Sequence, residues 1–320
     1  MNCYLAPMEG ITGYIYRNAH HDIFGGVDKY FSPFISPNQK KKFSSKEIND
    51  ILPEHNQGIP LVPQILTNQA EDFIWAALEF KALGYEEVNL NLGCPSGTVV
   101  SKKKGAGFLA YPDRLDLFLE QVFSALDLRI SIKTRIGKTD PDEFYELIEI
   151  YNKYPLEELI IHPRIQTDYY KNTPNMKVFQ DGLKLGKAPI CYNGDLFTAD
   201  RAGQFSNHYP QVKTVMLGRG VIANPGLVIQ LKENIAPDKE RLKAFHDEVY
   251  EGYKKIMSGE RNPLFRMKEL WFYMGHMFTS PDKYMKKIKK AERFCDYDMA
   301  VSALFGEQEV KPEGGYQGVQ

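Results

Sequence analysis

The segment EVNLNLGCP at residues 87–95 contains the pattern on which the fold assignment rests, an expected strand that leads directly into a polar turn. Seven other short apolar runs, most of them rich in β-branched residues, recur along the sequence. The expected strands lie at residues 3–7, 29–35, 60–65, 87–92, 130–135, 158–162, 190–193 and 214–217. Most are continuous apolar runs without strict alternation, which is typical of parallel strands buried on both faces.

Amphipathic stretches that favour helices lie between these strands, at residues 70–83, 113–126 and 140–153. The last of them begins with Asp140 and Pro141, a helix cap followed by a first-turn proline. Strands that alternate with helices indicate either a (β/α)₈ barrel or a doubly wound sheet. The count of eight strands favours the TIM barrel.

The strand signals stop after about residue 234, and residues 238–306 show a helical pattern. We therefore predict an α/β protein with a TIM barrel over residues 1–236 and an all-helical domain over residues 237–308. Residues 309–320 are rich in Gly, Glu, Pro and Gln, a composition that predicts a flexible tail. A length of 320 residues suits one barrel with an appended domain.

The charge of the chain is unevenly distributed, although its net value is only −1. Residues 239–293 contain fourteen Lys and Arg against eight Asp and Glu, a net charge of +6. A basic segment on an otherwise acidic protein favours contact with RNA, although a solvated helix surface would have the same composition.

Other features of the sequence exclude several classes of protein. The sequence contains no run of eighteen apolar residues, so we expect no membrane-spanning helix. The N-terminal sequence MNCYLAPMEGIT lacks the basic and apolar regions of a signal peptide, so we expect a cytoplasmic protein. The four cysteines form no CxxC pair, so we expect neither disulfides nor a metal site. A monomer is the default expectation.

Glycine-rich motifs follow the last two expected strands, where TIM barrels usually bind phosphate groups. Gly194 follows the seventh strand, and Gly218 and Arg219 follow the eighth. Glycines let backbone N–H groups approach an anion, and Arg219 would add a fixed positive charge. The same glycines would also suit ordinary tight turns, but two such motifs in these loops favour a phosphate-bearing ligand.

Three polar residues at other strand ends could contact the ring of a flavin. Lys133 in the barrel mouth needs an anionic partner, and a reduced flavin carries negative charge near N1 and O2. A structural ion pair is the alternative for Lys133. Gln64 could read the pyrimidine edge of the flavin or form an ordinary hydrogen bond within the barrel. His162 could bind a flavin carbonyl or phosphate, or be structural.

Cys94 begins a long loop at the expected active face of the barrel, and loops of this length are usually functional. Its thiol could donate a proton to a substrate carbon as a general acid, although a lone cysteine is often a small buried hydrophobe. The same loop contains Lys102, Lys103 and Lys104. This lysine run would suit a phosphodiester backbone, or it could be a solvated loop.

Taken together, these motifs resemble the tRNA-dihydrouridine synthase family over nearly the whole barrel. The matching segments are APMEGIT at 6–12, PQILTN at 63–68, VNLNLGCPSGTVVSKKKGAGFL at 88–109, IKTRIG at 132–137, LIIHPRIQTDYY at 159–170, CYNGD at 191–195 and VMLGRGVIANPGL at 215–227. The segment NPLFRMKELWFY at 262–273 resembles the helical domain of the family.

The resemblance implies an FMN-dependent oxidoreductase that uses NADPH to reduce a D-loop uridine of tRNA to 5,6-dihydrouridine. It implies hydride transfer to C6 of the base and proton transfer from Cys94 to C5. Asn91 and Arg135 would bind the substrate base. The implied FMN site consists of Pro7, Met8, Gln64, Lys133, His162, Asn193, Gly194, Asp195, Gly218 and Arg219. For the RNA backbone we expect contacts from Lys102, Lys103, Lys104, Lys286 and Lys287.

The sequence departs from the family pattern at two places. His162-Pro163-Arg164-Ile165 stands where the family usually has HGRT, and Pro163 removes a backbone donor. Gly13 stands where the family usually has aspartate. Neither change affects Cys94 or Lys133, so we expect activity to be retained.

Two alternative functions are compatible with parts of the sequence. An FMN barrel that acts on a free pyrimidine would not need the basic helical segment. A catalytically silent RNA-binding relative would not need Cys94, Lys133 and Arg219, all of which are present.

Overall fold

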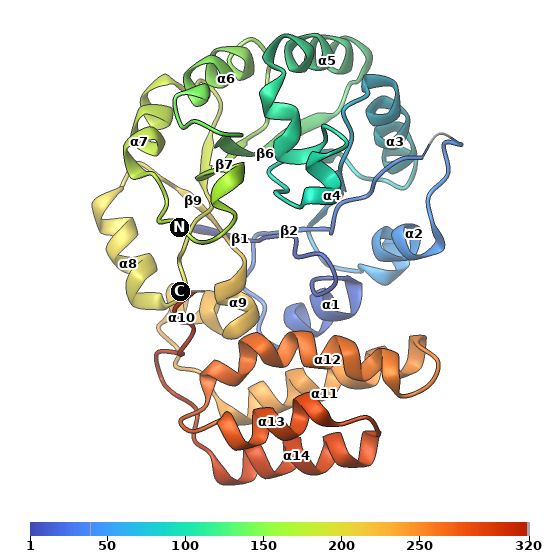
Figure 1. Ribbon diagram of the computed structural model, residues 1–320, viewed down its shortest axis with the longest axis vertical. Helices are drawn as coiled ribbons and strands as arrows, with labels where there is room; N and C mark the ends of the chain where they lie inside the picture. The colour runs from blue at the N-terminus through green and yellow to red at the C-terminus, as the bar shows by residue number, and fades with distance from the viewer. Residues whose placement is uncertain (39, 319–320) are drawn as a thin grey trace.

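The computed structural model describes residues 1–38 and 40–318 and consists of a barrel with a layer of helices below it (Figure 1). In this part of the chain the strands form one sheet, in the order β3-β2-β1-β9-β8-β7-β6-β5-β4, and every pairing is parallel. The strands are β1 (Asn2–Leu5), β2 (Lys29–Phe31), β3 (Leu61–Val62), β4 (Gln64–Ile65), β5 (Glu87–Leu92), β6 (Arg129–Gly137), β7 (Leu159–Ile165), β8 (Ile190–Tyr192) and β9 (Thr214–Leu217).

The sheet closes because β3 and β4 are two halves of one strand, separated by Pro63. Pro63 lacks the N–H group that would continue the ladder, but its carbonyl accepts from the N–H of Asn89 at 2.9 Å. On the other side, Ile35 forms a parallel bridge with Ile65. The two edge strands of the sheet, β3 and β4, therefore follow each other directly in the chain, which closes the sheet into a barrel. The predicted TIM barrel is confirmed.

Helices follow one another around the outside of the sheet in the order of the chain (Figure 1). They are α1 (Tyr14–Ile23), α2 (Ser45–Ile51), α3 (Ala70–Ala82), α4 (Gly97–Val100), α5 (Pro112–Ala125), α6 (Glu143–Tyr151), α7 (Met176–Leu185), α8 (Ala199–His208), α9 (Arg219–Ala223) and α10 (Leu227–Glu233). α3 and α5 agree with the predicted helices. α6 begins at Glu143, not at Asp140, because the Glu143 carboxylate accepts hydrogen bonds from the backbone N–H groups of residues 138–140.

The interior of the barrel and the space outside it contain separate apolar clusters. Alternate residues of each strand point to opposite faces. Thus Cys3 and Leu5 belong to the large cluster between the sheet and the helices, whereas Tyr4 and Ala6 belong to a small inner cluster with residues of other strands. The inner cluster consists of Tyr4, Ala6, Phe31, Val62, Ile160, Cys191 and Met216.

The C-terminal helices form a bundle that lies against one side of the barrel (Figure 1). They are α11 (Lys239–Ile256), α12 (Arg261–Met274), α13 (Asp282–Lys290) and α14 (Phe294–Glu307). α11 packs against α1, and Arg266 of α12 donates to the carbonyl of Gly10 at 3.1 Å. The bundle therefore lies beside the loop that follows β1. No helix in the described chain is both long and apolar enough to cross a membrane.

The segment after α14 packs onto the protein, whereas the sequence predicts a flexible tail. Val310 forms a bridge with Phe278, and the Tyr316 ring is only 3% exposed. This ring contacts Phe197 of the barrel and Tyr273 of α12. Burial of a large aromatic ring offsets the entropy cost of ordering the described part of this segment, residues 309–318, and composition alone does not reveal such a contact.

Candidate active site

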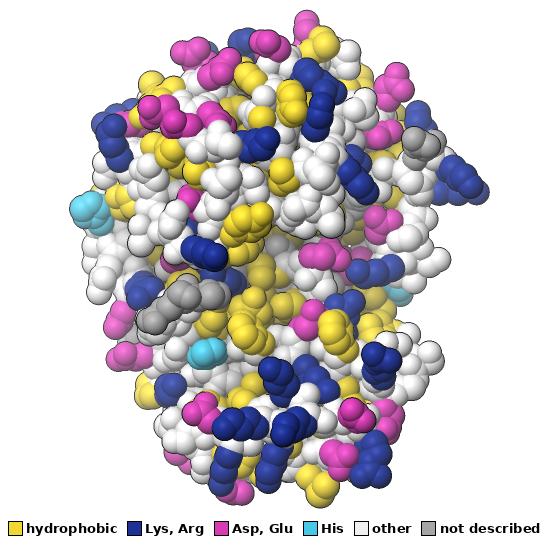
Figure 2. Space-filling model, viewed as in Figure 1, with side chains coloured by type: hydrophobic (Ala, Val, Ile, Leu, Met, Phe, Trp, Pro, Cys, Tyr) yellow, Lys and Arg dark blue, Asp and Glu magenta, His cyan; other side chains and the backbone are white. Residues whose placement is uncertain are grey.

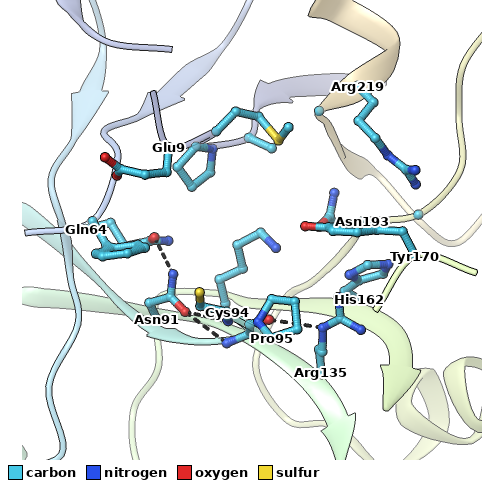
Figure 3. A pocket seen from close by; sticks show the side chains of 18 of the residues that line it. Glu9, Gln64, Asn91, Cys94, Pro95, Arg135, His162, Tyr170, Asn193 and Arg219 are labelled. Atoms are coloured by element: carbon cyan, nitrogen blue, oxygen red, sulfur yellow. Dashed lines mark hydrogen bonds between the residues drawn. The ribbon is translucent and has the colours of Figure 1, made fainter. Parts of the chain in front are cut away.

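A cavity of about 290 Å³ opens at the carboxyl ends of the barrel strands (Figure 3). It brings together every predicted catalytic and cofactor-binding residue, and also Asn91 and Arg135. The predicted residues that line it are Pro7, Met8, Gln64, Asn91, Cys94, Lys133, Arg135, His162, Asn193, Gly194, Asp195, Gly218 and Arg219. These residues come from distant parts of the sequence, so only the closed barrel places them around one space.

Cys94 is held at the cavity by hydrogen bonds to its backbone (Figure 3). The Asn91 Oδ1 atom accepts from the N–H of Gly93 at 3.0 Å and from the N–H of Cys94 at 2.9 Å. The Cys94 carbonyl accepts from the N–H of Ala106 at 3.1 Å. Burial raises the pKa of the Cys94 thiol above its ordinary value, so the thiol keeps its proton at neutral pH. This is the state that a general acid requires.

Gly105 packs directly against Cys94 and explains part of the glycine-rich loop. Its φ of +54° lies in the left-handed region. A Cβ atom on Gly105 would lie 2.9 Å from the Cys94 carbonyl oxygen and 3.0 Å from the Cys94 Cβ. A side chain at this position would therefore displace the residue that carries the thiol.

We expect Gly105→Ala to reduce activity and to destabilise the protein by about 1–3 kcal/mol, because it adds backbone strain and pushes on Cys94. Thermal unfolding and turnover measured on the same preparation would test this. Gly97→Ala is the matched control, since Gly97 lies in the same loop and a Cβ there would meet nothing within 4 Å. Equal stability and activity of the two variants would contradict the expectation.

A chain of buried amide side chains supports Asn91 from within the barrel. The Asn91 Nδ2 atom donates to Gln64 Oε1 at 2.6 Å, and Gln64 Nε2 donates to Asn89 Oδ1 at 2.8 Å. Asn89 Nδ2 in turn donates to Ser131 Oγ at 2.9 Å. Each bond assigns donor and acceptor roles to the next amide. The chain therefore orients Asn91 so that its oxygen faces the backbone of Cys94.

The chain continues to a charged pair deeper in the barrel. Ser131 Oγ donates to Glu87 Oε1 at 2.9 Å, and Lys29 Nζ lies 2.7 Å from Glu87 Oε2. Gln64 thus has the internal hydrogen bonds that we considered as the alternative to flavin contact. Gln64 also lines the cavity, so its predicted flavin contact stays a prediction. Asn89, Ser131 and Glu87 were not among the predicted site residues.

Lys133 brings a positive charge to the cavity without a protein counter-ion. Among the residues that the structure describes, no carboxylate forms an ion pair with it, so the structural ion pair considered above is absent there. Burial, and then repulsion from Arg135, lowers the pKa of Lys133 to about 8. A buried ammonium group in this state would gain from an anionic ligand.

Arg135 organises the backbone around the cavity. Its Nε donates to the Gly93 carbonyl at 3.0 Å, and its Nη1 and Nη2 donate to the carbonyls of Ile165 and Tyr169 at 2.8 and 2.7 Å. The side chain is fully buried. The structure therefore gives Arg135 a positioning role, and its predicted contact with a substrate base would have to use the N–H groups that remain.

Two arginines share the carboxylate of Asp195 at the ends of β7 and β9. Arg164 Nη1 and Arg219 Nη2 donate to Asp195 Oδ1 at 2.9 and 2.8 Å. One carboxylate cannot balance two guanidinium groups, so this end of the cavity is electropositive. Within the described chain, the Arg219 Nη1 atom is buried without a hydrogen-bond partner. Such a donor points to an acceptor supplied by a ligand.

Arg164 was not among the predicted site residues, although it directly follows the strand-end pair His162-Pro163. The β6–β7 register slips by one residue between Arg135 and Gly137, so Pro163 and Arg164 lie at a bulge. A bulge tolerates a proline because no ladder hydrogen bond is required there. This explains how β7 accommodates the departure from the family pattern.

These donors fit a phosphorylated flavin. The unpartnered Arg219 N–H suits a phosphate, and Lys133 suits the electron-rich edge of the ring system. Burial, and then the charges of Arg135 and Lys133, lowers the pKa of His162 well below its ordinary value. His162 is therefore neutral and can donate one hydrogen bond without adding charge.

The predicted RNA-binding lysines lie outside the cavity. Lys102 and Lys103 are exposed on the loop that follows Cys94, and Lys104 donates to Ser36 Oγ at 3.2 Å. Lys286 and Lys287 are exposed on α13. None of these five lysines lines the cavity, and their predicted contact with RNA stays a prediction.

The fold and the site together define an oxidoreductase of the flavin-dependent TIM-barrel class. Among solved structures, the old yellow enzyme homologue from Zymomonas mobilis matches with a TM-score of 0.53 over 76% of this chain and 92% of that chain. Its sequence identity is 12%, so this likeness concerns the fold alone.

The family model described as dihydrouridine synthase (Dus) matches residues 4–312, and the chain belongs to this family. The "Probable tRNA-dihydrouridine synthase 2" of Bacillus subtilis is 27% identical over 83% of each chain. The "tRNA-dihydrouridine synthase B" of Pasteurella multocida is 28% identical over 73% of this chain and 70% of that protein.

Proposed function

We propose that this protein reduces the C5–C6 double bond of a D-loop uridine in tRNA, with FMN as its bound cofactor and NADPH as the reductant. The observation that carries the proposal is the cavity itself. It combines a protonated thiol at Cys94, an unpaired ammonium group at Lys133 and an unpartnered guanidinium N–H at Arg219. The names of the curated relatives support tRNA as the substrate.

FMN, when bound, supplies the hydride that NADPH delivers. Arg219 would hold its phosphate, and Arg164 helps to position Arg219 because both bind the Asp195 carboxylate. Lys133 would neutralise negative charge on the pyrimidine edge of the cofactor. Asn193 is itself held in place, since its Nδ2 donates to the Met216 carbonyl at 2.8 Å. These residues bind and orient the cofactor and leave the proton transfer to Cys94.

Cys94 completes the reduction by proton transfer. A hydride adds to C6 of the uridine, and the proton of the Cys94 Sγ adds to C5, so the double bond is saturated and solvent reprotonates the thiolate. The hydrogen bonds from Gly93 and Cys94 to Asn91 keep the thiol at a defined place during this step. A base can reach the cavity only after it leaves its stack, as in other enzymes that act on bases.

The test is an assay with purified protein, NADPH and unmodified tRNA, with dihydrouridine mapped by position. We expect dihydrouridine at one defined site. A yellow protein that oxidises NADPH and leaves tRNA unchanged would contradict the proposal. Activity on free uracil or orotate would then support the alternative of a free-pyrimidine reductase, and a protein that cannot be loaded with FMN would support the silent relative.

The basic helix α13 leads to a prediction about tRNA binding. Replacing both Lys286 and Lys287 by glutamate should weaken tRNA binding by about tenfold or more at low salt and reduce its salt dependence, because phosphate contacts are lost. Filter binding at several salt concentrations would measure both effects. The control replaces Lys184 and Lys187 by glutamate. These exposed lysines precede β8 at the opposite end of the barrel. Equal losses in both variants would indicate a nonspecific effect of net charge.

A further inference from the structure

A second hollow adjoins the active-site cavity between the barrel mouth and the helical bundle. It measures about 950 Å³ and is lined mainly by residues of α12 and α13. Met8 and Glu9 line both this hollow and the active-site cavity, so the two spaces are adjacent. A polymer with one unit in the active site could therefore place its neighbouring units in this hollow.

Two phenylalanines of α12 face this hollow and remain exposed. Phe265 and Phe272 line it, and each is 57% exposed. They lie seven residues apart, so they share one face of the helix. The buried face of α12 is formed by other residues, including Leu264, Met267 and Trp271. Phe265 and Phe272 therefore do not serve the core, and a paired exposure of this kind marks an interaction surface.

The charges around the two rings favour an anionic partner. Lys268 lies between the two phenylalanines in sequence, and Lys286 and Lys289 line the hollow from α13. Figure 2 shows apolar side chains gathered in the hollow and Lys and Arg side chains across the bundle below it. Among the described residues, neither Lys286 nor Lys289 forms an ion pair.

The acidic residues of the hollow are largely neutralised. Glu269 pairs with Arg266 at 2.8 Å, and Glu9 pairs with Lys46 at 3.1 Å. Asp282, in the first turn of α13, offsets part of the lysine charge. Exposed aromatic rings interleaved with unpaired lysines are the combination by which proteins bind single-stranded nucleic acid.

We propose that Phe265 and Phe272 form a stacking platform for unpaired RNA bases near the target uridine. This inference rests on the proposed tRNA substrate, whose loops present bases that can splay out and stack on aromatic side chains. Seven residues of helix correspond to about 10 Å, and stacked nucleotides are spaced by about 3.4 Å. The two rings therefore engage two different bases, and Lys286 and Lys289 contact the phosphates between or beside them.

Leucine variants at the two positions test the platform, because leucine is apolar but cannot stack. Phe265→Leu and Phe272→Leu should each weaken binding of an unmodified tRNA transcript and of a labelled single-stranded oligouridylate by about five- to one-hundredfold. In the tRNA assay, KM should rise more than kcat falls. Phe272→Tyr should bind both RNAs as the native protein does, because its ring can still stack.

Met299→Ala is the matched control, since Met299 is an apolar side chain of the same bundle, 65% exposed and outside the hollow. Thermal unfolding would establish that each variant is folded. Leucine variants that bind both RNAs as tightly as the native protein would overturn the platform, and the apolar surface would then serve another partner.

The same experiment separates the platform from the proposed reaction. If the native protein forms dihydrouridine while the leucine variants keep full RNA affinity, the proposed function holds and the stacking platform is wrong. A native protein that forms no dihydrouridine but binds the oligouridylate through Phe265 and Phe272 retains the platform and loses the proposed function.

Discussion

Replacing Cys94 by alanine is expected to lower dihydrouridine formation by about 10²- to 10⁴-fold, the contribution of a positioned general acid. The thiol is protonated at neutral pH because burial raises its pKa, and Asn91 holds its backbone at the cavity. Alanine removes the proton donor and little else, so the variant should still bind FMN. Mapping dihydrouridine in tRNA and recording the flavin absorbance of the same sample would measure both properties.

Two further variants sharpen the test of Cys94. Cys94→Ser keeps a small polar group but is a much weaker acid, so its activity should stay far below that of the native enzyme. Cys295→Ala changes an exposed cysteine on α14 and should leave activity unchanged. Dihydrouridine formation by Cys94→Ala at the native rate would show that another group delivers the proton.

Replacing Lys133 by methionine is expected to weaken FMN binding or slow its reduction by about ten- to one-hundredfold, the range for a lost charged hydrogen bond. Lys133 has no ion-pair partner among the described residues, so its charge is available to the cofactor. Methionine preserves the length and apolar stem of the side chain. Flavin titration and stopped-flow reduction by NADPH would locate the loss in binding or in reduction.

The pH dependence of the native enzyme provides an independent check. Because the pKa of Lys133 is lowered to about 8, the ammonium group is lost as pH rises through this value, and activity should fall on the alkaline side. Lys133→Met should lack this alkaline fall. A bound anion would raise the pKa of Lys133, so the fall should shift to higher pH once FMN is saturating.

The lowered pKa of Lys133 also makes the free energy of unfolding of the FMN-free protein depend on pH. The pKa of Lys133 is about 8 when folded and near its ordinary value of 10.5 when unfolded. Between these values the unfolded chain binds more protons, so the contribution of Lys133 to the free energy of unfolding rises with pH. Denaturant titrations of native protein and Lys133→Met at pH 8 and pH 10 would detect this difference.

Much of the fold could be predicted from local sequence patterns. The expected strands at 87–92 and 214–217 coincide with β5 and β9. In β5 the apolar Val88, Leu90 and Leu92 alternate with polar residues and pack into the large cluster between the sheet and the helices. The residues after the strands could be assigned to one site, since the carboxyl ends of barrel strands meet at one face. Cys94, Lys133 and Arg219 all lie in the cavity as a result.

The residues that the sequence analysis missed depend on contacts between distant segments. Arg164 belongs to the site because it donates a hydrogen bond to Asp195, which lies on a different loop. Tyr316 looks like part of a flexible tail until its ring is placed against Phe197 and Tyr273. Neither contact has a signature in the residues that flank it, because each depends on how the closed barrel and the bundle are positioned.

Periodicity and the position of a residue at a strand end are local properties, so the sequence alone was enough to predict the barrel, the helical segment and the side chains at the barrel mouth. Which of these side chains face one another depends on the packing of the whole chain. The parallel register sets Asn91 beside Lys133 and Arg135 beside His162. A shift of one residue would turn these side chains to the other face of the sheet. Register is set by pairing between distant strands, which is why no single stretch of sequence specifies it.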